Sequence, residues 1–186
     1  MEEEYLRSVS TAEPQPLDGP VELVEYSADW PVLFLREAQR LRAVLGDRAF
    51  RIEHVGSTSV PGLAAKPIVD VVLIVKDSAE EPAYVPALEA AGYILRIRET
   101  QFHEHRMFKG PDTDVNLHVF SSRCPEVERM LLFRDRLRDD EADRELYGRT
   151  KRELARRRWK YVDDYAQAKG AVVEEILSRA RALAGR

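Results

Sequence analysis

The sequence of 186 residues lacks features on which several classes of protein depend. Its single cysteine, Cys124, excludes an intrachain disulfide and any cysteine-rich metal site, and it fits a reducing compartment. No apolar run approaches the roughly 18 residues that a membrane-spanning helix needs. Three glutamates follow Met1, which is not the basic start of a signal peptide. We therefore expect a cytoplasmic protein without a membrane partner.

The composition that remains is typical of a globular domain, with 44% hydrophobic and 33% charged residues. The net charge of −4 is unevenly distributed, because residues 121–186 carry seventeen bases and thirteen acids. The bases are concentrated in residues 144–160, which form either an ordinary solvated helix face or a surface that meets an anionic substrate. Only Trp159 and Tyr161 are present there for base stacking, so the sequence does not favour a nucleic-acid partner.

The most informative stretch is 53–75, in which a turn of small residues is followed by a hydrophobic strand. Gly56 lets the backbone turn tightly, and Ser57 and Thr58 offer hydroxyl and N–H groups that suit an anion such as phosphate. Asp70 interrupts an apolar run, where a strand buried on both faces would be continuously apolar. A carboxylate there needs a partner, and a metal ion or a catalytic role are candidates. The alternative is a capped turn and an Asp whose charge is met by a lysine or a backbone N–H.

The periodicity of the chain divides it into a tail and one domain. Residues 1–20 contain several prolines and little to bury, which predicts a disordered or loosely held acidic tail. Residues 21–186 form a single domain, with a mixed sheet core over 21–122 and helices over 123–186. We expect strands over 50–55, 67–75, 93–98, 103–110 and 113–120, and helices over 29–45, 84–91, 125–137, 141–158 and 161–184. The predicted fold class is α+β, a mixed β-sheet flanked by helices, with a C-terminal helical part.

A second polar feature lies on the predicted strand 113–120. Side chains alternate along a strand, so Asp114, Asn116 and His118 share one face and the apolar residues share the other. This polar row is either a solvent-facing strand surface or one wall of a site that Asp70 completes. In the second case, the side chains of Asp70 and His118 lie within about 10 Å of each other.

The order and spacing of these residues carry a family resemblance. Gly56-Ser57, followed after twelve residues by Asp70 in a hydrophobic strand, resembles the signature of the nucleotidyltransferase (polymerase-β-like) superfamily. More closely, residues 56–70 resemble the GrpB family. The resemblance continues in order through Asp29-Trp30-Pro31, Gly92-Tyr93, residues 116–119 and 133–138, Tyr147 with Lys151 and Leu154, and Tyr165 with Lys169.

The superfamily resemblance implies transfer of a nucleoside monophosphate from a nucleoside triphosphate to an acceptor, with the help of a divalent metal. Such a transfer needs positioning and charge neutralisation more than covalent chemistry. Asp70 and His118 are then the catalytic candidates, and Asp70, Asp114 and His118 are the candidate ligands of Mg²⁺, Mn²⁺ or Zn²⁺. The candidates for phosphate or nucleotide binding are Gly56, Ser57, Thr58, Lys66, Arg106, Asn116, Arg134, Arg138, Tyr147 and Lys151.

The sequence departs from the superfamily pattern two residues after Asp70. A second acid is usual there, and this chain has Val72. One carboxylate is a poor cage for Mg²⁺. Two functions therefore stay open: a nucleotidyltransferase with an unknown acceptor, or a catalytically degenerate domain that binds a nucleotide or another small phosphorylated molecule for regulation or scaffolding. The nucleotide, the acceptor and the oligomeric state do not follow from the sequence.

Overall fold

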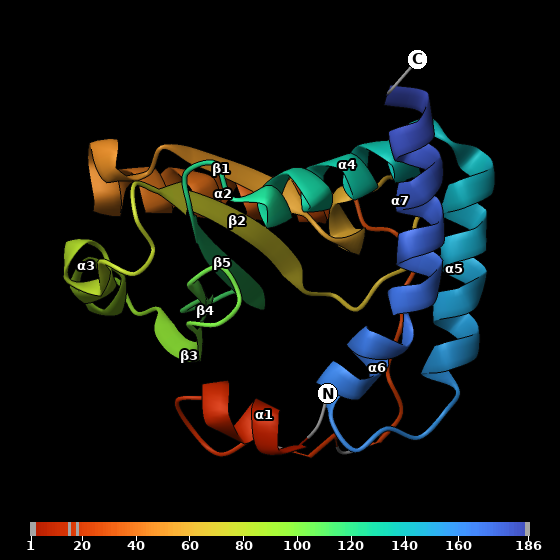
Figure 1. The fold of residues 1–186 in the computed structure, drawn as a ribbon, viewed down its shortest axis with the longest axis horizontal. Coiled ribbons are helices and arrows are strands. Elements are labelled where there is room, and N and C mark those ends of the chain that lie inside the picture. The colour runs from red at the N-terminus through yellow and green to blue at the C-terminus, as the bar shows by residue number, and fades with distance from the viewer. Residues whose placement is uncertain (1–2, 15, 18, 185–186) are drawn as a thin grey trace.

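The computed structural model describes residues 3–14, 16–17 and 19–184, which form a five-stranded sheet with helices on both faces (Figure 1). The strands are β1 (Arg51–Val55), β2 (Val69–Val75), β3 (Ile94–Glu99), β4 (His105–Lys109) and β5 (Val115–Ser121). The helices are α1 (Glu3–Val9), α2 (Asp29–Leu45), α3 (Val85–Ala90), α4 (Pro125–Asp139), α5 (Glu141–Ala155), α6 (Val162–Ala168) and α7 (Gly170–Ala184). Three short 3₁₀ turns are η1 (Gly46–Arg48), η2 (Ser57–Ser59) and η3 (Glu81–Ala83). This architecture confirms the predicted α+β class.

The strand order is β1-β2-β5-β4-β3, with β2 and β5 parallel and the other neighbours antiparallel. β1 and β2 are adjacent, with Val55 opposite Asp70, and Ser57 lies in the turn that follows β1. On the other side of β2, Asp70 is opposite Asn116 of β5. The end of β1 and the starts of β2 and β5 therefore meet at one corner of the sheet.

Two apolar layers cover the sheet. α2 and α3 pack on one face, where Leu41, Leu73 and Phe108 are fully buried. α4 packs on the other face, over Val72 and Phe120. The Val/Ile/Leu run of β2 fits this position because both of its faces are covered. Asp70, the polar residue of β2, lies on the same face as Val72, at the end of the strand where the sheet corner is.

The C-terminal helices form the helical part that the sequence predicts, with one difference. The predicted helix 161–184 is divided, because α6 ends at Ala168 and α7 begins at Gly170. Glycine is a poor helix residue, so a change of direction costs little there. α6 contacts α5 and α7, and α7 packs against α4 and α5 (Figure 1). Across the described ranges, no helix combines the length and apolarity that a bilayer span requires.

The N-terminal segment differs from the loosely held tail that the sequence predicts. Residues 3–9 form α1, in which Leu6 and Val9 are buried. Thr11 N donates to Arg96 O at 2.9 Å, so the segment is also tied to β3. Local composition does not predict this docking, because β3, which α1 contacts, is distant in the sequence.

Candidate functional site

Gly56 places the turn after β1 directly against Asp70. Its φ of 69° lies in the left-handed region, and a Cβ at this position would be 2.4 Å from Asp70 Oδ2. Only glycine permits this approach without a clash. In η2, which follows, Ser57 and Thr58 line a cavity together with Asp70. The turn thus brings Ser57 and Thr58 to the cavity of the strand carboxylate, with the Thr58 hydroxyl 3.1 Å from His54 Nε2.

The polar row of β5 meets the same carboxylate. Asn116 Nδ2 donates to Asp70 Oδ1 at 2.8 Å, and His118 Nε2 lies 3.8 Å from that oxygen, well inside the predicted separation. Burial opposes ionisation of Asp70, but interactions with His118 and Asn116 and the charge of Lys66 outweigh it and lower the pKa of Asp70. Asp70 is therefore a carboxylate at neutral pH.

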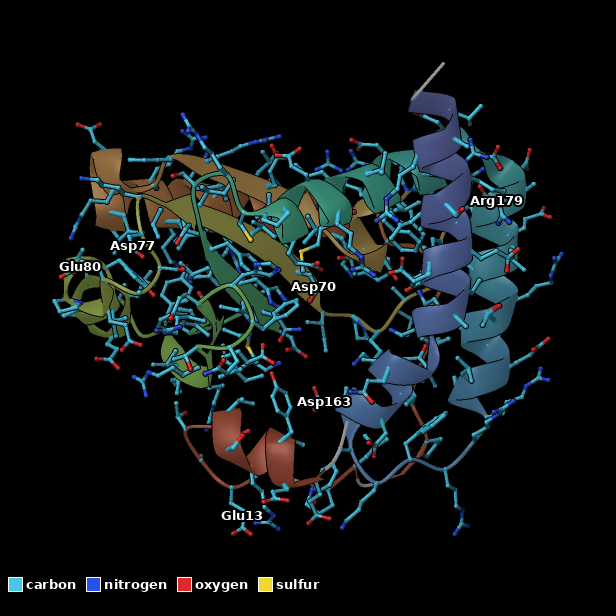
Figure 2. The ribbon with its side chains drawn as sticks, viewed as in Figure 1. Glu13, Asp70, Asp77, Glu80, Asp163 and Arg179 are labelled. Atoms are coloured by element: carbon cyan, nitrogen blue, oxygen red, sulfur yellow. The ribbon has the colours of Figure 1, made fainter. Side chains whose placement is uncertain are left out.

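The cavity has a volume of about 270 Å³ and lies between the sheet corner and the C-terminal helices. Figure 2 shows Asp70 at the end of β2 and Asp163 on α6, on opposite sides of this region. The wall on the sheet side is formed by Leu23, Ser57, Thr58, Ala65, Lys66, Ile68, Asp70, Ile97, Met107, Asn116 and His118. The wall on the helical side is formed by Lys151, Val162, Asp163, Tyr165, Ala166 and Lys169.

Three lysines converge on this cavity from different elements. Lys66 precedes β2, Lys151 is on α5, and Lys169 lies between α6 and α7. Burial lowers the pKa of all three, and Asp70 opposes this effect. The charge of Lys169 lowers the pKa of Lys151 further, and that of Lys66 lowers the pKa of Lys169. The pKa of Lys151 falls to about 7 and that of Lys169 to about 8. These ammonium groups are held close to one another at a cost in electrostatic energy.

The lysines have few hydrogen-bond acceptors in the protein. Lys151 Nζ donates to Ala64 O at 2.5 Å, and Lys169 Nζ lies 4.5 Å from the centre of the Tyr165 ring. Tyr165 is 1% exposed, and within the described part of the chain its hydroxyl has no hydrogen-bond partner. Burial raises the pKa of the nearby Asp163 carboxyl. The helical wall therefore presents more donors than acceptors.

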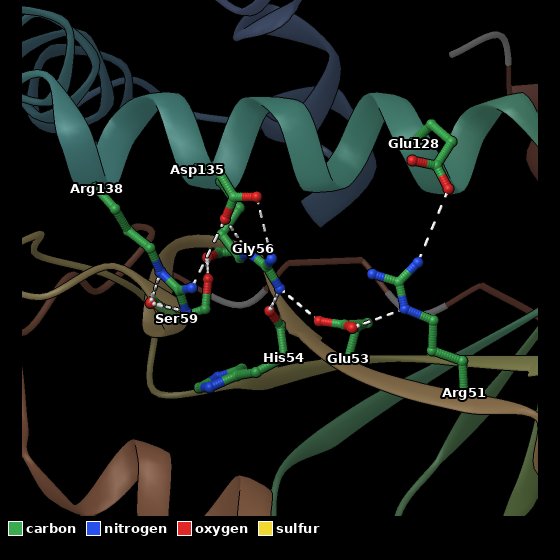
Figure 3. A network of polar contacts seen from close by, with 9 residues as sticks. Arg51, Glu53, His54, Gly56, Ser59, Glu128, Asp135 and Arg138 are labelled. Atoms are coloured by element: carbon green, nitrogen blue, oxygen red, sulfur yellow. Dashed lines mark hydrogen bonds and ion pairs between the residues drawn. The ribbon is translucent and has the colours of Figure 1, made fainter.

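The predicted arginines of α4 are not in this cavity. Arg138 Nε and Nη2 donate to Ser59 O at 2.9 and 2.8 Å. Arg134 Nη1 donates to Glu53 Oε2 at 2.7 Å and to His54 O at 3.0 Å. Figure 3 shows α4 passing over β1 and the turn, with Arg138 directed to Ser59. The two side chains hold the turn from the α4 side, because α4 covers the sheet face on which Val55 and Val72 lie.

Three other residues that the sequence predicts for the site do not line the cavity. Arg106 alternates with Met107 on β4, so it points to the opposite face of the sheet and donates to Glu81 at 2.6 Å. Asp114 pairs with Lys109 Nζ at 3.3 Å, outside the cavity lining. Tyr147 is packed in the apolar cluster under the turn, where burial raises its pKa and an interaction with Ser57 opposes that rise.

The residues present do not fit a divalent metal. Among the described residues, no group of three or more His, Cys, Asp or Glu side chains is arranged to hold a metal ion. Val72, at the position of the second acid, is fully buried beneath α4. Asp70 is left as one carboxylate that shares its cavity with three lysines, whose charges disfavour a further cation.

Sequence reasoning missed part of the helical wall. Tyr165 and Lys169 were part of the resemblance but not of the predicted site, and Asp163 was not identified. The available signal was a repeated spacing, because Tyr147–Lys151 and Tyr165–Lys169 are each four residues apart and share a helix face. Which helix faces the sheet could not be read from that spacing.

Comparison with known proteins is consistent with this architecture. The chain matches the family model described as GrpB protein over residues 20–179. A UPF0157 protein of Halalkalibacterium halodurans is 56% identical over 180 residues, which cover 97% of this chain and 92% of that protein. The crystal structure of conserved protein GrpB from Enterococcus faecalis is similar with a TM-score of 0.77 and 32% identity, covering 89% of this chain and 100% of that one. A dephospho-CoA kinase of Mycolicibacterium paratuberculosis is 41% identical over 78 residues, 40% of this chain and 19% of that protein. The chain therefore belongs to the GrpB protein family.

Proposed function

We propose that this chain binds a small phosphorylated molecule, and a nucleotide in the first instance, in the lysine-lined cavity without a divalent metal. The observation that carries the proposal is the convergence of Lys66, Lys151 and Lys169 on one cavity. Ammonium groups that are removed from water and repel one another are costly unless an anion meets them. A phosphate group provides that anion, with an acceptor oxygen for each lysine.

The two carboxylates of the cavity narrow the class of ligand. Asp70 and Asp163 would repel phosphate, so they are suited to accept hydrogen bonds from a hydroxyl or amino group elsewhere on the same molecule. A ligand that bears both a phosphate and such donors satisfies both sets of residues. Nucleotides and sugar phosphates have this combination.

The partial likeness to a protein named dephospho-CoA kinase supports the same class, because dephospho-CoA contains a nucleotide and phosphate groups. We therefore choose ATP, AMP, pyrophosphate and dephospho-CoA as first probes. Isothermal titration calorimetry in the presence of EDTA measures their affinity without metal. We expect at least one probe to bind under these conditions.

Neutralising one lysine tests whether the cavity is the site. Loss of a charged hydrogen bond is worth about 1.5–3 kcal/mol, so Lys169→Gln and Lys66→Gln should each weaken binding roughly 10- to 100-fold. Lys76→Gln is the matched control, because Lys76 is exposed at the far end of β2 and its loss changes the net charge equally. Absence of binding by all four probes, or binding that requires Mg²⁺, would contradict the proposal.

Nucleotidyl transfer is the second candidate function. It is favoured by the retained part of the superfamily signature, the Gly56-Ser57 turn seated against Asp70. Release of pyrophosphate from nucleoside triphosphates in Mg²⁺, Mn²⁺ or Zn²⁺ would reveal it. Activity that is lost in Asp70→Asn would make the chain an enzyme of this class, whereas metal-free binding without pyrophosphate release supports the binding function.

A further inference from the structure

Four polar side chains from four neighbouring strands form a line that ends in the cavity. Glu99 Oε2 of β3 is 2.6 Å from His105 Nδ1 of β4. His105 Nε2 is 3.0 Å from His118 Nδ1 of β5. His118 Nε2 is 3.8 Å from Asp70 Oδ1 of β2. Because His105 and Glu99 lie outside the cavity lining, the binding function above does not account for them.

The contacts at the outer end determine where the imidazole protons lie. Burial opposes ionisation of Glu99, but hydrogen bonds from His105 and Tyr5 outweigh it and lower the pKa of Glu99. The carboxylate has no proton to give, so the hydrogen of the 2.6 Å contact is on His105 Nδ1. Burial lowers the pKa of His105, which is therefore neutral and has a lone pair on Nε2.

The position of the hydrogen on His105 determines the position of the hydrogen on His118. His105 Nε2 is an acceptor, so the hydrogen of the 3.0 Å contact belongs to His118 Nδ1. In neutral His118 the remaining nitrogen, Nε2, then has a lone pair. The ring of His105 is confined against Phe120, with centroids 4.7 Å apart, and the two histidine rings are within 16° of parallel. A ring rotation that reversed these roles would break both contacts.

When His118 is neutral, the cavity end of the line has two acceptors facing one gap; when His118 is protonated, its Nε2–H faces Asp70 and lowers the pKa of that carboxyl. The 3.8 Å between His118 Nε2 and Asp70 Oδ1 is too long for a direct hydrogen bond. Asp70 Oδ1 also accepts a hydrogen bond from Asn116 Nδ2. That amide group therefore donates to Asp70 and not to His118 Nε2. A group with a hydrogen to donate would satisfy the gap, and an O–H group of a ligand has this chemistry.

We propose that Glu99 and His105 are positioning residues that present His118 Nε2 as a proton acceptor to an O–H group of the cavity ligand. The nature of that ligand rests on the proposed function, whereas the orientation of the acceptor does not. If the proton is transferred, the ligand O–H bond breaks and an N–H bond forms at Nε2. The charge on the imidazolium is then balanced by Asp70 and, through His105, by Glu99.

The tautomer of His118 is a direct readout of this inference. Long-range ¹H–¹⁵N correlation spectra of the ¹⁵N-labelled protein, at a pH where imidazole is neutral, distinguish a protonated ring nitrogen from one with a lone pair. The chain has four histidines, so His54→Gln, His103→Gln and His118→Gln suffice to assign the spectrum. We expect the hydrogen of His118 on Nδ1. A hydrogen on Nε2 in the unaltered protein would overturn the proposal.

Two substitutions test the positioning residues. His105→Phe keeps a ring against Phe120 but removes the acceptor for His118 Nδ1, so the population with hydrogen on Nδ1 should fall. Glu99→Leu frees His105 to carry its hydrogen on Nε2 and should have the same effect. The exposed His103 serves as control, because His103→Gln should leave the His118 tautomer unchanged. Circular dichroism checks that each variant is folded.

The remaining outcomes are also decisive. An unchanged tautomer in folded His105→Phe or Glu99→Leu would contradict the positioning role. Zn²⁺ or Mn²⁺ that shifts or broadens the His118 Nε2 signal at stoichiometric concentration would make the gap a metal site and overturn the proposal. Failure of the phosphate probes to bind would contradict the proposed function alone, because the tautomer is measured in the ligand-free protein.

Discussion

Two glycines with a positive φ allow backbone strain and close approach to be compared. Gly56 and Gly62 have φ values of 69° and 77°, but a Cβ at Gly62 meets nothing within 4 Å. We expect Gly62→Ala to lose only the strain of a left-handed residue, about 1–2 kcal/mol. Gly56→Ala should lose on the order of 1–3 kcal/mol more, because Asp70 must also move. Urea unfolding measures the free energy of unfolding of both variants. An equal decrease in the two would show that Asp70 moves aside without a cost in stability.

Because the cavity lysines have lowered pKa values, we expect their charges to destabilise the ligand-free protein. Lys169 has a pKa of about 8 in the folded chain against an ordinary value of 10.5, so between these values the unfolded chain binds more protons. The free energy of unfolding should therefore increase as the pH rises from about 8 to about 10. Lys169→Met should stabilise the protein at pH 7 by about 1–2 kcal/mol, because it removes a charge that burial and the repulsion of Lys66 both disfavour.

The measurement is urea unfolding of the ligand-free protein at several pH values. The gain from Lys169→Met should shrink toward pH 10, where Lys169 is neutral in the folded state. Lys76→Met is the matched control, since Lys76 is exposed and should show no such dependence. A gain that is the same at pH 7 and pH 10 would show that packing, and not charge, is responsible.

At the scale of elements, the sheet could be predicted because each strand has a local signal. The expected ranges of β2, β4 and β5 agree with the structure to within two residues at each end. Their alternation or continuous apolar run reflects which faces are covered, and this is a property of the strand itself. The juxtaposition of Asp70 with Asn116 and His118 followed from the same alternation together with the superfamily resemblance.

The orientation of the helices could not be predicted in the same way. Arg134 and Arg138 share a face of α4, and the sequence shows their spacing of four residues. It does not indicate that this face holds the turn from the α4 side, because helix packing depends on surfaces from distant parts of the chain. Arg106 was assigned to the cavity for a related reason: its strand was identified, but its face depended on the strand register. Lys169 was overlooked because the division between α6 and α7 has only Gly170 as a signal.

At the scale of the whole molecule, α1 joins the two walls of the cavity. Tyr5 Oη donates to Glu99 of β3 at 2.9 Å, and Tyr161 Oη, beside α6, donates to Glu3 at 3.1 Å. In Figure 1, α1 lies beneath β3 and next to α6. The contact of Tyr5 is exposed and that of Tyr161 is partly buried, and one such hydrogen bond contributes only about 1 kcal/mol. Burial of Leu6 and Val9 is therefore the main source of docking energy.

This arrangement predicts that loosening α1 affects α6 before it affects the sheet. Leu6 is 4% exposed, so Leu6→Ala should weaken docking by about 2 kcal/mol. Because stability differs between parts of a structure, we expect faster hydrogen exchange in α1 and α6, with no change in β2. Leu183→Ala is the matched control, since Leu183 is 53% exposed on α7. Faster exchange in α1 alone would mean that α6 is held by α5 and α7, and equal acceleration in β2 would mean that the chain opens as a single unit.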